Sequence, residues 1–166
     1  MSEQEHTHHN RAVLERLMEI ITNGEYDALP EVLHPDFVQE IPQSGERVVG
    51  IQNFRKILEN LPGGGSGLTF ARDPHIAGDE ERYVMTPTFT AVRVEGIGDE
   101  LTSYVQAKYP DGSDWYIVTF SSYKDGKMIR RVDFFAPFFD PPEWRAEWAE
   151  KPATVRTDTG SAGSRS

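Results

Sequence analysis

The chain has 166 residues, a formal net charge of −10 at pH 7 and no cysteine. Its length and its 37% hydrophobic content suit a single domain with a real core and exclude global disorder. The negative charge argues against nucleic acid or an anionic membrane as the main partner, because both select surfaces rich in Lys and Arg. The absence of cysteine excludes a disulfide framework, a thiolate nucleophile and a Cys-type zinc site.

No apolar run approaches the length of a membrane span. Residues 1–5 also lack the basic start and apolar centre of a signal peptide. We therefore expect a cytoplasmic protein.

The first third of the chain is predicted to be mainly helical. Apolar residues recur at helical spacing over residues 13–21, and Asn23-Gly24 offers a left-handed end. A second short helix is expected from Asp27, its N-cap, to the stop at His34-Pro35, followed by a short strand over residues 37–41. A third helix after Gly50 carries one apolar stripe of Ile51, Phe54, Leu58 and Leu61.

The glycine-rich run at residues 62–67 has two possible interpretations. It could be a phosphate loop, but no Lys-Ser/Thr pair and no helix follow it. A flexible linker is the favoured interpretation.

The remainder of the chain reads as strands. Alternating or β-branched and aromatic patterns, separated by Gly-Asp and Asp-Gly turns, cover residues 68–76, 81–94, 101–109, 115–123 and 127–135. Helices followed by a long antiparallel sheet define an α+β domain. The sheet must cover the apolar stripes of the helices, so we expect it to curve around them and to leave an internal cavity.

The predicted boundaries are a flexible N-terminus over residues 1–9, one domain over residues 10–150 and a disordered tail over residues 151–166. Near the end of the domain, Trp144 and Trp148 lie four residues apart and therefore on one face of a short helix. These tryptophans could cap the core or stack on a ligand.

The last predicted hairpin contains the best candidate for chemistry. Arg131 and Asp133 are two residues apart and so lie on one face of a strand, among Val132, Phe134 and Phe135. Opposite charges in such apolar surroundings are costly to bury unless they pair or act on something. The pair is either a functional site or a structural ion pair, and structural ion pairs are the more common kind.

The turn of this hairpin decides which residues share a face. A three-residue loop at Lys124-Asp125-Gly126, with Gly126 left-handed, would set Tyr123 opposite Lys127. The inner face would then hold Ile117, Thr119, Ser121, Tyr123, Ile129, Arg131, Asp133 and Phe135. The outer face would hold Tyr116, Val118, Phe120, Met128, Val132 and Phe134, an apolar patch that calls for a partner. A two-residue turn would exchange these pairings.

Four strings give the chain a family resemblance. They are NGEYDAL at residues 23–29, HPDF at 34–37, IPQSGE at 41–46 and DGKMI at 125–129. Together they resemble the SnoaL-like branch of the nuclear transport factor 2 superfamily, over roughly residues 10–150. FAPF at residues 135–138, leading to Trp144-Arg145, resembles a bacterial subgroup whose reactions are largely unassigned.

The resemblance implies a conical α+β barrel, mostly antiparallel, with an internal pocket between sheet and helices, usually in a homodimer. It includes polyketide cyclases, ketosteroid isomerases, limonene epoxide hydrolases, dehydratases and non-catalytic binders, so the fold alone does not fix a function.

Transferring the family chemistries residue by residue leaves one carboxylate. The three positions that an isomerase-like site would use hold Leu17, Ile41 and Thr119, which lack the required acids and phenol. A last-strand aspartate acts as water-activating base in the epoxide hydrolases and as acid/base in the SnoaL-type cyclases, which carries this role onto Asp133. The hydrolase positions that hold Tyr and Asn correspond here to Val38 and Glu40.

The predicted catalytic residues are Asp133, which would abstract a proton or activate water, Arg131, which would stabilise an oxyanion, and Glu40, which either lies at the pocket mouth or faces solvent. The predicted ligand-binding residues are Leu17, Gln39, Ile41, Phe54, Leu58, Ile117, Thr119, Ser121, Tyr123, Phe135 and Trp144.

No cofactor and no metal are expected. The histidines at positions 6, 8 and 9 have no carboxylates framing a site, and His75 is either a strand residue or a general acid facing the cavity. The sequence predicts a cofactor-independent acid/base enzyme, of cyclase, isomerase, dehydratase or hydrolase type, acting on a small apolar metabolite. The alternative is a non-catalytic module that binds a small molecule. A homodimer through the outer sheet face is expected in either case.

Overall fold

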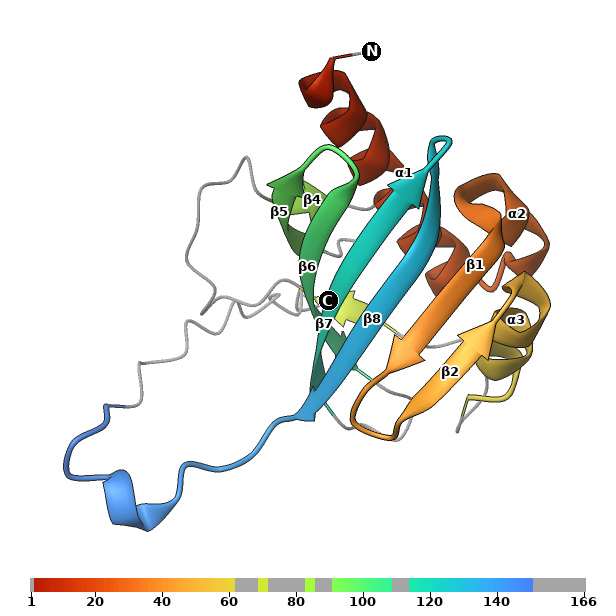
Figure 1. The fold of residues 1–166 in the computed structure, drawn as a ribbon. Helices are drawn as coiled ribbons and strands as arrows, with labels where there is room; N and C mark the ends of the chain where they lie inside the picture. Colours follow the sequence, from red (N-terminus) through yellow and green to blue (C-terminus); the bar gives the residue numbers. More distant parts are fainter. Residues whose placement is uncertain (1, 62–68, 72–82, 86–90, 109–113, 151–166) are drawn as a thin grey trace, which may run out of the picture.

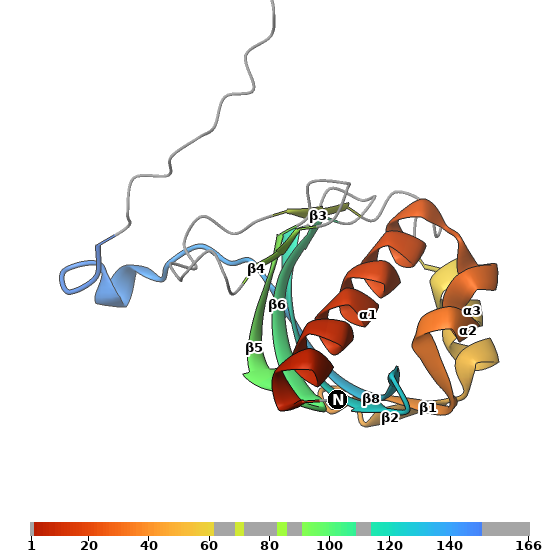
Figure 2. The ribbon, with the colours of Figure 1, turned by 90° about the horizontal axis from the view of Figure 1, so that it is seen from above.

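The computed structural model describes residues 2–61, 69–71, 83–85, 91–108 and 114–150 (Figure 1). The N-terminal helices lie along one face of a mixed sheet (Figure 2). The expected linker at residues 62–67, the tail at 151–166 and His75 lie outside the described residues. No helix among the described segments is long and apolar enough to cross a membrane.

Helix α1 (Glu3–Asn23) begins seven residues before residue 10, where the domain was expected to start. Ser2 and Glu5 form a capping box, in which the Ser2 backbone N–H donates to Glu5 Oε2 at 2.6 Å and the Glu5 N–H donates to Ser2 Oγ at 3.3 Å. Residues 3–9, expected to be a flexible terminus, are therefore helical. The helix ends at Gly24, where φ is 71°, as the Asn-Gly sequence predicted.

The second helical segment is shorter than expected. A 3-10 turn (Tyr26–Ala28) leads into α2 (Leu29–Val32), and β1 (Leu33–Ile41) starts four residues before the predicted strand. The reason is Pro35, which cannot continue a helix and disfavours helical backbone at the residue before it. Gly50, at φ 83°, then precedes α3 (Ile51–Glu59).

The described strands form one eight-stranded sheet with β8, β7 and β6 in its middle. The strands after β1 are β2 (Glu46–Val49), β3 (Thr69–Ala71), β4 (Tyr83–Met85), β5 (Ala91–Ile97), β6 (Glu100–Lys108), β7 (Asp114–Lys124) and β8 (Lys127–Pro137), followed by the short helix η3 (Glu143–Arg145). Their order is β2-β1-β8-β7-β6-β5-β4, with β3 also paired to β6.

Every strand pair within the described residues is antiparallel except β1 with β8, which is parallel. The α+β class with a mostly antiparallel sheet is confirmed. In the part of the chain that is described, no pairing joins β2 to β4 at the two ends of the strand order. Closure into a conical barrel therefore stays a prediction.

The β7–β8 hairpin does not have the three-residue loop that we expected. Asp125 and Gly126 both have positive φ (52° and 72°) and form a two-residue turn, so Lys124 pairs with Lys127 and Tyr123 with Met128. Beyond them Ser122 pairs with Arg130, which leaves Ile129 as an additional, unpaired residue.

This β-bulge shifts the register by one residue. Beyond it, the residues of β7 and β8 therefore share faces as the three-residue loop had predicted. Thr119 is opposite Asp133 and Ser121 is opposite Arg131, and Asp133 points to the inner face. Met128, expected on the outer face, is instead fully buried.

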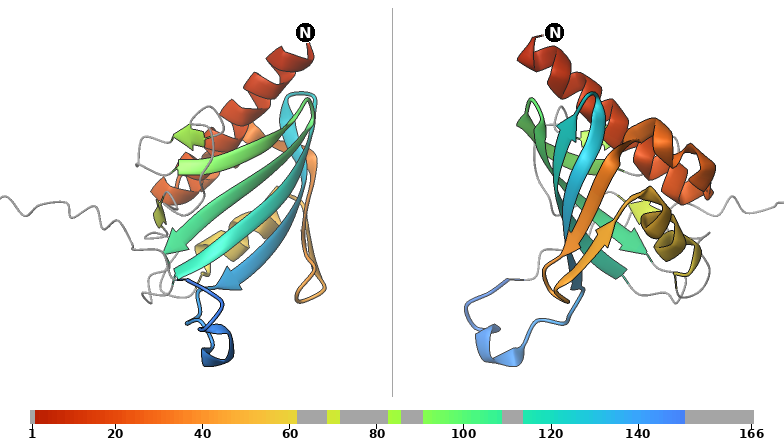
Figure 3. Two further views of the ribbon diagram at one scale, coloured as in Figure 1. Left: turned by 90° about the vertical axis from the view of Figure 1, so that its left-hand side faces the viewer. Right: turned by 45° about the vertical axis from the view of Figure 1, so that its right-hand side comes forward.

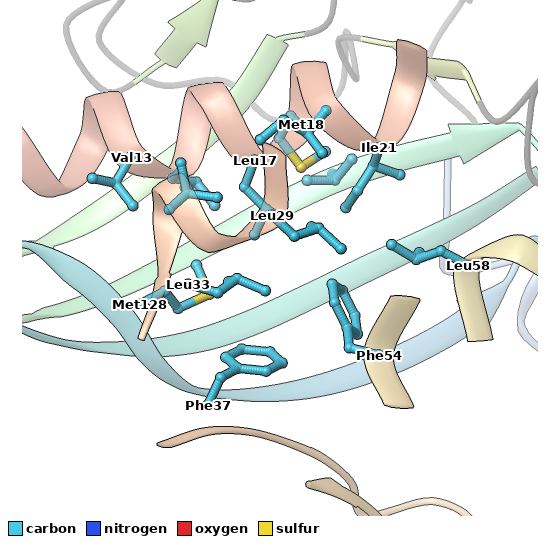
Figure 4. Close-up of a cluster of buried hydrophobic side chains, with 14 of the residues drawn as sticks. Val13, Leu17, Met18, Ile21, Leu29, Leu33, Phe37, Phe54, Leu58 and Met128 are labelled. Carbon is cyan, nitrogen blue, oxygen red and sulfur yellow. The ribbon is translucent and has the colours of Figure 1, made fainter. Parts of the chain in front are cut away.

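The core lies between the helices and the inner face of the sheet. Figure 4 shows Leu17 and Met18 of α1 in one cluster with Leu29 and with Phe54 and Leu58 of α3, over the strands. Phe37, which is fully buried, packs against the Phe54 ring with centroids 5.2 Å apart. The packed side chains fix the distance between helices and sheet, and a cavity remains at one end of this layer.

Candidate ligand pocket

A cavity of about 220 Å³ lies between the inner sheet face and the helices α1 and α3. Helical side chains form one wall and four neighbouring strands, β1, β8, β7 and β6, form the other. The lining is Leu14, Met18, Ile21, Gln39, Ile41, Phe54, Ile57, Leu58, Leu61, Ser103, Val105, Ile117, Thr119, Arg131 and Phe135. Most of these residues are apolar, so the cavity suits a hydrophobic molecule.

The polar residues of the cavity converge on one buried carboxylate. Asp133 has no solvent exposure and accepts four hydrogen bonds. Nε and Nη2 of Arg131 donate to its two oxygens at 2.7 Å each, Gln39 Nε2 donates to Oδ2 at 2.5 Å, and Thr119 Oγ1 donates to Oδ1 at 2.5 Å. Asp133 is not one of the lining residues, whereas its three partners are.

Arg131 lines the cavity, and Asp133 neutralises its charge. Its side chain is 11% exposed, and its guanidinium carbon lies 5.6 Å from the centre of the Phe54 ring. A guanidinium over an aromatic face is attracted by the ring quadrupole. The ring and the carboxylate together hold the Arg131 head in one place.

Gln39 has one atom without a partner. Its Nε2 donates to Asp133, but its Oε1 is buried and has no hydrogen-bond partner among the described residues. A buried acceptor without a donor is unusual in a folded protein and costs free energy.

Residues 14–132 match the family model described as a SnoaL-like domain. The chain belongs to the SnoaL-like domain family. No curated protein matches it.

Several solved structures share the fold of this SnoaL-like domain. An NTF-2-like protein of unknown function from Burkholderia xenovorans LB400 is 22% identical, with a TM-score of 0.64, over 88% of this chain and 97% of that one. A proposed ketosteroid isomerase from Kribbella flavida is 21% identical, with a TM-score of 0.65, over 90% and 94%. An LEH-like epoxide hydrolase from M. tuberculosis is 16% identical, with a TM-score of 0.57, over 81% and 82%. At these identities the likeness establishes the fold alone.

The SnoaL-like cavity brings together many of the residues that the sequence selected. Among the expected residues, those that line it are Arg131, Gln39, Ile41, Phe54, Leu58, Ile117, Thr119 and Phe135. They come from four separate elements, so only the tertiary structure makes them neighbours.

Three expected binding residues lie in the core instead of on the cavity. Leu17 is fully buried against other apolar side chains. Ser121 donates to the Leu101 carbonyl oxygen at 3.1 Å and forms a 3.3 Å hydrogen bond with the Tyr123 hydroxyl. Burial raises the pKa of Tyr123 to about 12. These polar groups support the strands β6 and β7.

Glu40 and Trp144 lie away from the cavity. Glu40 follows Gln39 on β1 and therefore points to the opposite face, where it pairs with Arg130 Nη2 at 2.5 Å. Trp144 lies in η3, is 73% exposed and stacks with Arg145, whose guanidinium carbon is 5.9 Å from the ring centre. Neither residue reaches the cavity.

The sequence reasoning missed part of the lining: Leu14, Met18, Ile21, Ile57, Leu61, Ser103 and Val105. The apolar members have the same periodicity as core residues, so no signal separated them from the core. Ser103 is opposite Thr119 in the β6–β7 register. A correct strand alignment would have placed this serine beside the predicted site. Among the described residues, no group of three His, Asp or Glu side chains could hold a metal ion.

Proposed function

We propose that this SnoaL-like domain binds a small, largely apolar molecule that carries one oxygen function. The main support for this proposal is an apolar cavity with a group of polar side chains in its lining. These side chains, Arg131, Gln39 and Thr119, all contact the buried carboxylate of Asp133. The apolar walls bind the skeleton and the polar end orients it. An empty apolar cavity of about 150 Å³ already accepts benzene, so about 220 Å³ suits a one- or two-ring molecule.

In this proposal Asp133 is a positioning residue. Both of its oxygens are occupied by donors from Arg131, Gln39 and Thr119. It acts on the ligand through these side chains, because it fixes their orientation and balances the Arg131 charge. Arg131 is the residue that would contact the ligand oxygen.

Acid/base catalysis without a cofactor is the second candidate, and one observation favours it. Asp133 is hydrogen-bonded to three side chains that line the cavity. If a bound substrate drew Arg131 towards a developing oxyanion, the carboxylate would be free to take a proton from carbon or from water. Cyclase, isomerase, dehydratase and hydrolase reactions of an apolar metabolite all fit this arrangement.

Molecules that remain bound during purification distinguish the two candidates. The purified protein is denatured, its extract is analysed by mass spectrometry, and the identified molecule is added back in excess. A molecule that is bound and recovered unchanged supports binding alone. Conversion that Asp133→Asn slows by orders of magnitude while the variant is still folded by circular dichroism, with Glu40→Gln unaffected, supports catalysis.

A cavity-blocking variant tests the location of the site. Ile41 lies on the lining and is only half-buried, so Ile41→Trp should obstruct the cavity without displacing a fully buried side chain. Val49→Trp is the matched control, since Val49 is 55% exposed and lies on neighbouring β2. Equal ligand retention in the two variants would contradict the proposal.

A further inference from the structure

The chemical groups around Asp133 fix which atom donates and which accepts in each hydrogen bond. A guanidinium only donates, and a carboxylate only accepts. Asp133 Oδ2 therefore accepts from Arg131 Nε at 2.7 Å and must also accept from Gln39 at 2.5 Å. The Gln39 amide has to present its NH₂ group to this oxygen, because its carbonyl oxygen would repel the carboxylate. The orientation of the amide is thus set by Asp133.

This orientation leaves acceptors at the polar end of the cavity. Gln39 Oε1 is directed away from the carboxylate and has no donor among the described residues. Thr119 uses its only hydroxyl hydrogen on Asp133 Oδ1, so its oxygen can only accept further hydrogen bonds. Both residues line the cavity, and Gln39 is only 5% exposed.

Arg131 supplies the complementary donors. Its Nε and Nη2 bind Asp133, while Nη1 makes no hydrogen bond with any residue that the structure describes. Gln39 and Arg131 are register partners on the paired strands β1 and β8, and both bind the same Asp133 oxygen. The residue with a remaining donor and the residue with an unsatisfied acceptor are therefore neighbours in the lining of the cavity.

We propose that the pocket selects a neutral ligand whose oxygen function carries a hydrogen, that is, an alcohol, a phenol, an enol or a protonated acid. This inference rests on the proposed binding function and specifies its ligand class. A hydroxyl accepts from Arg131 and donates to Gln39 Oε1, so it satisfies both groups. A ketone or ether of the same skeleton accepts from Arg131 but leaves Oε1 without a donor.

An anionic ligand fits less well. Asp133 already neutralises Arg131 in a bidentate ion pair, so the polar end has no net positive charge. A carboxylate would also face the acceptor oxygens of Gln39 and Thr119. No group in the site would therefore offset the free-energy cost of removing an anion from water.

Three probes that differ in one group test the inference: 1-indanol, 1-indanone and indane. Their binding to the purified full-length chain is measured by calorimetry at pH 7. We expect the alcohol to bind about tenfold more tightly than the ketone, the ratio that one additional satisfied hydrogen bond gives. Equal affinity of alcohol and ketone, with both bound, would overturn the ligand class and leave the pocket in place. Failure of all three to bind would instead contradict the proposed function, and this inference with it.

A variant assigns the discrimination to Gln39. Gln39→Met keeps the length of the side chain but has no acceptor, so it should abolish the preference for 1-indanol over 1-indanone while indane still binds. Gln52→Met, on the exposed side of α3, is the matched control and should keep the preference. A preference that persists in Gln39→Met would overturn the assignment. If this variant does not fold, the three-probe comparison on the unmodified chain still decides the ligand class.

Discussion

The Asp133 carboxylate accepts two hydrogen bonds of 2.7 Å from the guanidinium of Arg131, its neighbour two residues earlier on the same strand. Asp133 is fully buried, and the Arg131 side chain is 11% exposed. Removal of one member of such a pair leaves the other charge buried without a counterion. The pair is therefore both the anchor of the pocket's polar end and a point where a single substitution is costly.

We expect Asp133→Asn to lower the free energy of unfolding by about 3–5 kcal/mol, because Arg131 loses its counter-charge in a buried site. Urea denaturation measures this value. Glu40→Gln breaks the Glu40–Arg130 pair on the other sheet face, whose side chains are 33% and 51% exposed, and should change the free energy by less than about 1 kcal/mol. Similar losses in the two variants would contradict the expected cost of leaving the Arg131 charge buried without a counterion.

We expect the folded protein to lose stability at alkaline pH because Tyr123 is buried. Burial raises its pKa from 10.0 to about 12, so the unfolded chain releases this proton near pH 10 and the folded chain retains it. Between pH 10 and 12 the unfolded state binds fewer protons, and the free energy of unfolding falls as pH rises. Two pKa units correspond to about 3 kcal/mol.

Denaturation of the unmodified chain and of Tyr123→Phe at pH 9 and pH 11.5 tests this effect. The Phe variant should lose much less stability between the two pH values. Tyr26→Phe is the control, because Tyr26 is only partly buried and its pKa is raised to a lesser extent. Parallel curves for the chain and Tyr123→Phe would contradict the prediction.

Gly96 is predicted to be intolerant of any side chain. Its φ is 115°, and a Cβ atom there would lie 2.3 Å from the backbone oxygen of Glu100. Gly96→Ala should therefore lower the free energy of unfolding by about 3 kcal/mol or more, through strain and displacement of the β5–β6 turn. Gly45→Ala is the control, since Gly45 also has a positive φ (74°) but nothing within 4 Å, and it should lose about 1–2 kcal/mol. Thermal denaturation compares the two; equal losses would indicate that the clash is relieved by a local shift.

The outer sheet face carries an apolar cluster that includes Phe120 and Phe134, which are 48% and 37% exposed and meet edge to face at 6.1 Å. Beside it Tyr116 stacks on Phe138 at 4.5 Å, at the start of the segment that leads away from the sheet (Figure 3). At its rim Arg130 is already paired with Glu40. A two-fold contact would bury these exposed aromatic side chains, and we propose that a second copy of this chain covers the face.

Sedimentation at micromolar concentration should give a species near twice 18.8 kDa. Phe120→Glu should shift it to the monomer, because it places a charge in the centre of the apolar contact. Ile97→Glu is the matched control: Ile97 is 66% exposed, but it lies by the β5–β6 turn, at the edge of this face and not at its centre. A monomer for the unmodified chain, or equal effects of the two variants, would contradict the proposal.

Local sequence determined the order of the elements and much of the pocket. The apolar periodicity of residues 13–21, the Asn-Gly stop and the alternation of the strands all depend on near neighbours, so they could be predicted without a partner. The same is true of Arg131 and Asp133, because two residues apart on a strand means one face. The family strings added the pocket and its last-strand carboxylate.

Tertiary structure decided that Arg131 and Asp133 lie on the inner face of the sheet. The turn at Asp125-Gly126 has two residues, and only the bulge at Ile129 returns Arg131 and Asp133 to the inner face. A bulge depends on how the strand pairs with both neighbours, and no residue type near Ile129 signals it. The parallel β1–β8 pairing likewise brings Gln39 to Asp133 across a separation of 94 residues, while Glu40, one position further, is directed to the opposite face. The sequence by itself determined the groups that could form a site, and only the packing of distant strands determined which of them share a cavity.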